Sequence, residues 1–207
     1  MQPEQAWDQV YATKAMAAYP DNALIRFVAK HYYGVPDRSA VRFLDVGCGA
    51  GASTWYLARE GFSVWAVDLS ATAIARLSQR LATERVYAHL AVGDIGSLTA
   101  HGNADFDCVV DVSSLCYVPA DEIADVMARL HSALKPGGRM FSITPSKRCA
   151  RGPFEAFADD VALTARFMTD DEVGACFARF SRISITGYDY TVADGSLVRL
   201  WAVEAEK

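Results

Sequence analysis

The glycines in the stretch FLDVGCGAGAS, residues 43–53, have the spacing of loops that hold a nucleotide against the backbone. Gly47, Gly49 and Ala52 satisfy the pattern G-x-G-x-x-G/A, in which the missing side chains let a ligand approach the main chain closely. Asp68 comes 21 residues after Gly47 (68 − 47 = 21), where an acidic residue binds the two hydroxyls of a ribose. The sequence therefore predicts a binding site for a ligand that contains a nucleoside.

Asp45 stands two residues before the first glycine and bears on the class of nucleoside ligand. A carboxylate here repels a pyrophosphate that lies on the loop, whereas it attracts a ligand that carries an ammonium and a sulfonium. Its charge therefore disfavours a nicotinamide dinucleotide and suits S-adenosylmethionine.

Short apolar segments alternate with helical patterns through the middle of the chain. Five segments are rich in Val, Phe and Ile, as parallel strands covered by helices are. They are residues 41–46, 63–68, 86–92, 106–112 and 139–144. Helical patterns occupy residues 52–60, 71–81 and 121–134. The alternation predicts βαβ units with right-handed crossovers, so the glycine loop lies at the carboxyl edge of a sheet.

Turn and cap residues mark the ends of these elements. Ser70 is expected to cap the helix that follows it, and residues 135–138, Lys-Pro-Gly-Gly, to end the last helix in a tight turn. Two further helices are predicted before the first strand, at residues 5–18 and 22–33. They are separated by Tyr19-Pro20-Asp21.

The C-terminal part departs from the alternation. A helix is predicted near residues 170–180, followed by the strands SRISITGYDYTV and SLVRLWAVEAE. Ala193-Asp194-Gly195 between these strands suits a hairpin turn. A hairpin at this point places an antiparallel strand in an otherwise parallel sheet.

Five motifs occur in a fixed order between about residues 41 and 144. They are LDVGCGAG, VWAVDLS, VGDI, FDCVVDVSSLCYVP and LKPGGRMFSIT. In these motifs the chain resembles the class I S-adenosylmethionine-dependent methyltransferases that act on small molecules. The resemblance implies a Rossmann-like, doubly wound α/β fold with a seven-stranded sheet in the order 3-2-1-4-5-7-6. Its last strand would be antiparallel, with helices on both faces.

The same resemblance implies one domain over residues 1–207. Its parts would be a helical cap at 1–40, a cofactor-binding core at 41–144, a substrate lid at 145–168, and a C-terminal helix and hairpin at 169–207.

The resemblance also implies which residues contact the cofactor. The loop of Gly47, Cys48, Gly49 and Gly51 would approach the methionine and ribose portions, and Asp45 would support the loop and the amino group.

Further implied contacts come from the ends of the next strands. Asp68 would accept the ribose hydroxyls, with Leu69 against the adenine. Asp94 would bind the adenine amino group and the Ile95 N–H a ring nitrogen. Asp111 would lie beside the methionine end and the reacting methyl group.

Aromatic residues of the N-terminal segment form a predicted cover. Trp7 and Tyr11 are four residues apart and share a helix face, where they either close over the sulfonium and substrate or pack into the core. Tyr19 is a further candidate for this rim. If the acceptor needs deprotonation, Tyr117 or Asp111 is the candidate catalytic group.

Substrate choice is expected to depend on segments outside the five motifs. The connection at residues 145–168 exceeds ordinary loop length and is predicted to form a helical lid containing Phe154. Arg148 and Arg151 are candidates for binding an anionic group of the substrate.

Composition limits the classes of partner. The 207 residues are 52% hydrophobic and carry a formal net charge of −5, which argues against a nucleic-acid partner. Neither a secretory leader nor a membrane-spanning run is recognisable, so a cytoplasmic protein without a membrane partner is expected. The five cysteines and four histidines lack metal-site spacing, so no metal is expected. A monomer or a homodimer would suit this composition.

The favoured function is transfer of a methyl group from S-adenosylmethionine, yielding S-adenosylhomocysteine, to a small molecule by in-line displacement. Two alternatives remain open. One is an NAD-dependent oxidoreductase, and the other is a regulatory module that binds the cofactor without turnover.

Overall fold

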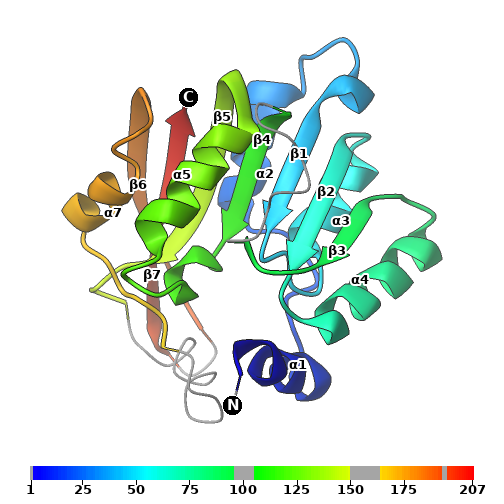
Figure 1. Ribbon diagram of the computed structural model, residues 1–207, viewed down its shortest axis with the longest axis horizontal. Coiled ribbons are helices and arrows are strands. Elements are labelled where there is room, and N and C mark those ends of the chain that lie inside the picture. The colour runs from blue at the N-terminus through cyan, green and yellow to red at the C-terminus, as the bar shows by residue number, and fades with distance from the viewer. Residues whose placement is uncertain (1, 96–104, 150–163, 193–194) are drawn as a thin grey trace.

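The computed structural model describes residues 2–95, 105–149, 164–192 and 195–207. Its centre is a seven-stranded sheet in the order β3-β2-β1-β4-β5-β7-β6 (Figure 1). The strands are β1 Arg42–Val46, β2 Ser63–Asp68, β3 His89–Val92, β4 Phe106–Val112, β5 Leu134–Pro145, β6 Arg182–Thr191 and β7 Leu197–Glu206. Strands β1 to β5 pair in parallel, whereas β7 is antiparallel to both β5 and β6. The predicted fold class, strand order and antiparallel strand are confirmed.

Helices cover both faces of the sheet. They are α1 Pro3–Thr13, α2 Asn22–Tyr32, α3 Ala52–Arg59, α4 Ala71–Glu84, α5 Ile123–Ala133 and α7 Asp170–Cys176, with short 3-10 turns η1 Arg38–Ala40 and η3 Leu115–Tyr117. Helices α2, α3 and α4 share one apolar cluster with the sheet, and α5 and α7 share the other. Side chains of β4 alternate between them, since Cys108 and Val110 belong to the first cluster and Val109 to the second. The parallel strands are therefore apolar on both faces, as their composition predicts.

Helix α1 stands apart from these two layers. It lies at the end of the sheet where the parallel strands finish (Figure 1). Its apolar residues Ala6 and Val10 form a small cluster of their own with Trp7. The helix ends at Thr13 rather than at residue 18, so a non-helical segment links it to α2.

The local cap and turn predictions have different outcomes. Ser70 caps α4 as predicted, because its hydroxyl accepts a hydrogen bond from the Ala73 N–H at 3.0 Å. The tight turn predicted at residues 135–138 is instead a bulge inside β5. Strand pairing already starts at Leu134, opposite Phe106, and resumes at Arg139, opposite Cys108. The four intervening residues are thus accommodated within the strand.

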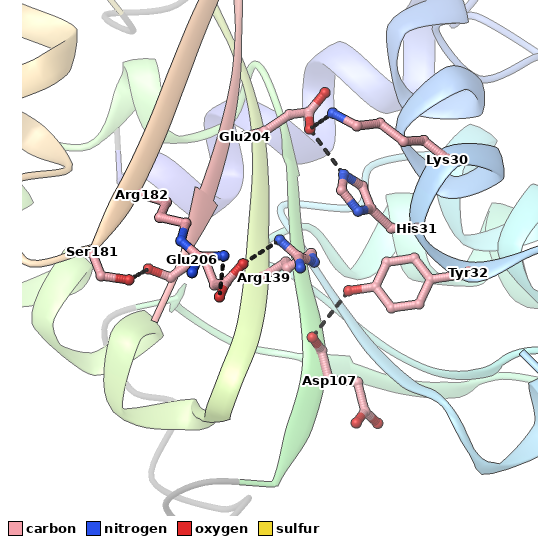
Figure 2. Close-up of polar contacts among 9 residues, drawn as sticks. All are labelled: Lys30, His31, Tyr32, Asp107, Arg139, Ser181, Arg182, Glu204 and Glu206. Carbon is pink, nitrogen blue, oxygen red and sulfur yellow. Dashed lines mark hydrogen bonds and ion pairs between the residues drawn. The ribbon is translucent and has the colours of Figure 1, made fainter.

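Polar contacts fasten α2 to the sheet (Figure 2). Lys30 and His31 contact the carboxylate of Glu204 in β7 at 2.9 and 3.0 Å. The Tyr32 hydroxyl donates to the carbonyl of Asp107 near the start of β4, at 3.2 Å. These contacts hold α2 against β4 and β7.

The hairpin between β6 and β7 pairs Thr191 with Leu197. Gly195 has a φ of 86°, which favours glycine, and its N–H donates to the carbonyl of Val192 at 2.9 Å. The predicted hairpin is confirmed, although residues 193–194 lie outside the described ranges. Across the described part of the chain, no helix combines the length and apolar character needed to cross a membrane.

Candidate active site

A cavity of about 810 Å³ opens at the carboxyl ends of the parallel strands. Loops after β1, β2, β3 and β4 supply Gly47, Asp68, Asp94 and Ser114 to its wall, and α1 contributes Trp7. Pockets for small molecules have volumes of roughly 300 to 1,000 Å³. The cavity is therefore large enough for a nucleoside ligand, and it lies where ligands bind in doubly wound sheets.

Asp68 is the best-oriented carboxylate on this wall. Its Oδ2 accepts a hydrogen bond from the Gly49 N–H at 2.7 Å, and its Oδ1 accepts from the Ser70 N–H at 2.9 Å. A carboxylate offers about four lone-pair positions, so capacity remains for the two hydroxyls of a ribose. Burial raises the pKa of this carboxyl, while the two N–H groups favour its ionised form. The geometry suits the role predicted for Asp68, and Leu69 lines the cavity beside it.

The three loop glycines serve mainly the packing of the chain itself. All three have left-handed φ values of 61°, 53° and 83°. A Cβ atom would also collide with Ser114 at Gly47, with Tyr11 at Gly49 and with Leu77 at Gly51. Of the three, Gly47 alone is among the described residues that line the cavity. Close approach of a ligand can therefore be a reason for glycine at Gly47 alone. At Gly49 and Gly51 the missing side chain leaves room for Tyr11 of α1 and Leu77 of α4.

Asp45 in β1 and Cys48 in the glycine loop are both outside the described lining of the cavity. The Asp45 carboxylate accepts a hydrogen bond from the Thr54 hydroxyl of α3 at 2.5 Å. Burial raises the pKa of Asp45 to about 7, and burial also raises the pKa of the Cys48 thiol. Asp45 therefore retains a proton more readily near neutral pH than an exposed aspartate does. The carboxyl of Asp45 therefore repels a pyrophosphate less strongly than a fully ionised aspartate would.

Asp111 is likewise buried outside the described lining of the cavity. It is 0% exposed, and its carboxylate accepts hydrogen bonds from Ser114 and Leu115 backbone N–H groups and from the hydroxyls of Ser114 and Ser142. These bonds shape the turn after β4, in which Ser113 has a φ of 59°. Ser113 and Ser114 line the cavity, so Asp111 positions the wall and is shielded from a reacting methyl group.

The aromatic cover predicted from the N-terminal residues closes one side of the cavity. The Trp7 ring packs edge-on against Tyr117, with 4.9 Å between ring centroids, and its centroid lies 6.0 Å from that of Tyr11. All three residues line the cavity. Burial raises the pKa of Tyr117 far above neutrality, so its hydroxyl keeps its proton. Tyr117 is thus suited to donate a hydrogen bond and to shape the pocket, and it is poorly suited to act as a base.

Helices α1 and α4 hold each other's ends. Asp8 accepts hydrogen bonds from the Ser70 hydroxyl at 2.6 Å and from the Thr72 N–H at 2.9 Å, so it caps the start of α4. Arg76 of α4 donates to the carbonyls of Ala12 and Lys14 at 3.3 and 3.2 Å, where α1 ends. Ser70 follows Asp68 closely, so the attachment of α1 is adjacent to the predicted ribose site.

The remaining predicted residues are divided between the cavity and other places. Asp94 and Ile95 line the cavity, and their contacts with the adenine stay a prediction. Tyr19 is 74% exposed and packs edge-on against Trp55, away from the described cavity wall. Arg148 is exposed and also outside that wall. Arg151 and Phe154 lie outside the described residues, as does most of the predicted lid.

Sequence reasoning missed Asp8 and Arg166, because neither residue belongs to a motif. Arg166 lines the cavity, in the same connection as the arginines that were proposed. The only sequence signal for Asp8 is its position beside Trp7 on a helix expected to cover the site.

The comparison with known proteins agrees with this geometry. Residues 43–138 match a family model described as a methyltransferase domain. The chain is 37% identical over 112 residues to the ubiquinone biosynthesis O-methyltransferase of Xylella fastidiosa, across 54% of this chain and 45% of that protein. Residues 43–138 are thus similar to a methyltransferase domain. It is also 36% identical over 116 residues to the magnesium-protoporphyrin O-methyltransferase of Rhodobacter capsulatus, across 53% of this chain and 47% of that protein.

The chain spans about half the length of the curated methyltransferases it matches. A solved structure concerned with conversion of a disulfide bond into a thioacetal group during echinomycin biosynthesis is similar over 100% of this chain and 92% of that chain. Its TM-score is 0.79 at 20% identity, which shows a shared fold. Helix α1 and Arg166 lie outside the residues matched by the methyltransferase model. The match to the methyltransferase model therefore does not extend to the parts of the cavity that α1 and Arg166 form.

Proposed function

We propose that the chain transfers a methyl group from S-adenosylmethionine to a small-molecule acceptor. The observation that carries the proposal is the tethered Asp68 carboxylate on the wall of an 810 Å³ cavity at the carboxyl edge of the sheet. Asp94 and Ile95 stand on the neighbouring loop, at the positions expected to receive the adenine. The backbone at Gly47 and the aromatic roof suit the methionine portion and the sulfonium.

The cavity has a residue of suitable chemistry for each part of this cofactor. Asp68 would hold the ribose, Asp94 the adenine amino group, and Trp7 would cover the charged sulfur. When bound, the cofactor supplies a methyl group on a positively charged sulfur, which a nucleophile removes by in-line displacement. The protein then has to align the acceptor and exclude water, and the roof of Trp7, Tyr11 and Tyr117 suits both tasks.

Acid–base catalysis has a minor part in this proposal. Asp111 is enclosed by its own hydrogen bonds, and Tyr117 retains its proton. We therefore propose an acceptor that is already nucleophilic at neutral pH, or one whose proton leaves to solvent. The curated relatives named above are O-methyltransferases, so oxygen acceptors come first in a substrate screen.

Calorimetric titration with S-adenosylmethionine, S-adenosylhomocysteine and NAD tests the binding half of the proposal. We expect both adenosyl ligands to bind with micromolar dissociation constants and NAD to bind at least about tenfold more weakly, a difference of about 1.4 kcal/mol. Comparable or tighter NAD binding would favour the oxidoreductase instead.

Turnover tests the chemical half. The protein is incubated with methyl-labelled S-adenosylmethionine and a small-molecule cell extract, and label transferred to the extract is counted. Transfer above that of the Asp68→Ala variant is expected. Tight cofactor binding without transfer would identify a binding module without catalysis.

A further inference from the structure

Arg166 stands on the cavity wall in a segment that is firmly anchored. Its backbone N–H donates to the carbonyl of Cys116 at 2.8 Å, and its Nη2 donates to the carbonyl of Leu115 at 3.0 Å. Two residues later, the carbonyl of Met168 accepts hydrogen bonds from the Lys147 N–H at 3.1 Å and from the Trp201 indole at 2.8 Å. The guanidinium is therefore held against η3, the turn that ends at Tyr117.

The charge of Arg166 is not neutralised by the residues that the structure describes. Its Nε is buried and has no hydrogen-bond partner, and no carboxylate pairs with the guanidinium in the described ranges. Several other described arginines are paired with carboxylates, namely Arg38–Glu60, Arg42–Asp105, Arg139–Glu206 and Arg199–Asp189. A half-buried guanidinium with a single carbonyl partner is costly unless a ligand supplies the missing acceptors.

The position of Arg166 assigns it to one side of the cavity. Asp68 and Asp94 mark the side proposed to hold the cofactor. Tyr117 and Pro119 follow β4 and Arg166 follows β5, on the other side of β1 from β2 and β3, and we term these lining residues the acceptor wall. A group bound there faces the position proposed for the methyl donor. Arg166 is thus placed to touch the acceptor.

We propose, as an extension of the methyl transfer proposed above, that Arg166 binds a carboxylate of the acceptor molecule. The planar guanidinium matches a carboxylate in two-point contact. A carboxylate suits the cavity better than a phosphate because Arg166 is the only Lys or Arg among its described lining residues. Glu122 on the same wall also disfavours a doubly charged anion. The carboxylate serves as a handle, since an arginine pair would weaken it as the nucleophile.

The test divides a small-molecule cell extract on an anion-exchange resin before the reaction. Each fraction then receives enzyme and methyl-labelled S-adenosylmethionine. We expect transfer with the retained fraction, loss of transfer after its carboxylates are capped as amides, and no loss after phosphatase treatment. Transfer confined to the unretained fraction would overturn the carboxylate and leave the methyltransferase proposal standing. Loss after phosphatase treatment would point to a phosphate instead. No transfer with the undivided extract would overturn both proposals.

Variants separate recognition from a purely structural role. For Arg166→Gln we expect the amount of retained fraction that gives half-maximal transfer to rise at least about tenfold, with S-adenosylmethionine affinity unchanged. Arg166→Lys should recover part of this loss because it keeps the charge. Arg148→Gln, an exposed arginine of the same connection, is the matched control and should behave as wild type. Equal loss of cofactor affinity and thermal stability in both Arg166 variants, without a change in acceptor requirement, would show that the residue is structural.

Discussion

Asp68 joins three parts of the site through one carboxylate. Replacing it by alanine removes the acceptor for the Gly49 and Ser70 N–H groups as well as for a bound ribose. A hydrogen bond to a charged group contributes about 1.5 to 3 kcal/mol, so cofactor affinity should fall at least about tenfold. Calorimetric titration with S-adenosylhomocysteine measures this loss, and a thermal melt checks that the fold survives. Asp68→Asn keeps the shape of the side chain, so we expect its thermal stability to stay close to that of wild type while its affinity for S-adenosylhomocysteine falls. Wild-type affinity in the alanine variant would show that the ribose binds elsewhere.

The motifs place some of the expected residues on the cavity wall, and their contacts with a cofactor stay predictions. Asp68 and Asp94 line the cavity as expected. Asp111 does not, because successive side chains of a strand point to opposite faces, and Val112 takes the place on the cavity wall. The glycine pattern located the loop, but it could not reveal that Tyr11 occupies the space beside Gly49. That contact depends on a helix far away in the sequence.

Helix α1 is attached to α4 through Asp8, and this attachment is expected to affect ligand binding more than the fold. Asp8→Ala leaves the Ser70 hydroxyl and the Thr72 N–H without their acceptor, so the roof over the cavity should loosen. We expect weaker cofactor binding and reduced transfer, with a cooperative melt of the sheet retained. The matched control is Asp125→Ala, which changes an exposed aspartate in the first turn of α5. Unchanged binding and turnover in the Asp8 variant would mean that α1 is peripheral to the site.

Most strands and helices were predicted from the periodicity of apolar residues. One error arose where strand pairing continued through residues that are typical of a turn. Pro136 and Gly137 indicate a turn, yet β4 begins to pair with β5 at Leu134 and resumes beyond them. The first helix was predicted too long because the residues after Thr13 carry no strong breaker before Pro20. The residues of the expected lid between 150 and 163 lie outside the described structure, so that part stays a prediction.

Buried carboxyls make the stability of the whole molecule dependent on pH. Asp45 has a pKa raised from 3.8 to about 7, first by burial and also by the charges of Asp111 and Asp68. The folded state therefore keeps a proton that the unfolded chain releases, and this contribution to stability declines as pH rises from about 4 to about 7. For Asp45→Asn, stability relative to wild type should improve steadily over that range and then level off. Urea unfolding of both proteins at several pH values measures the difference. A difference that is constant from pH 5 to 7.5 would contradict the raised pKa.

Strand β7 lies between β5 and β6, although β6 precedes it in the chain. During synthesis or refolding, β6 therefore has no neighbour to pair with until β7 arrives, whereas β1 to β5 can already form a parallel sheet. The two strands are joined by a tight hairpin in which Thr191 pairs with Leu197, so their pairing closes only a short loop once β7 is present. In pulsed hydrogen exchange during refolding, the amides of β6 should become protected together with those of β7. Protection of β6 before β7 would require a transient partner for its edge.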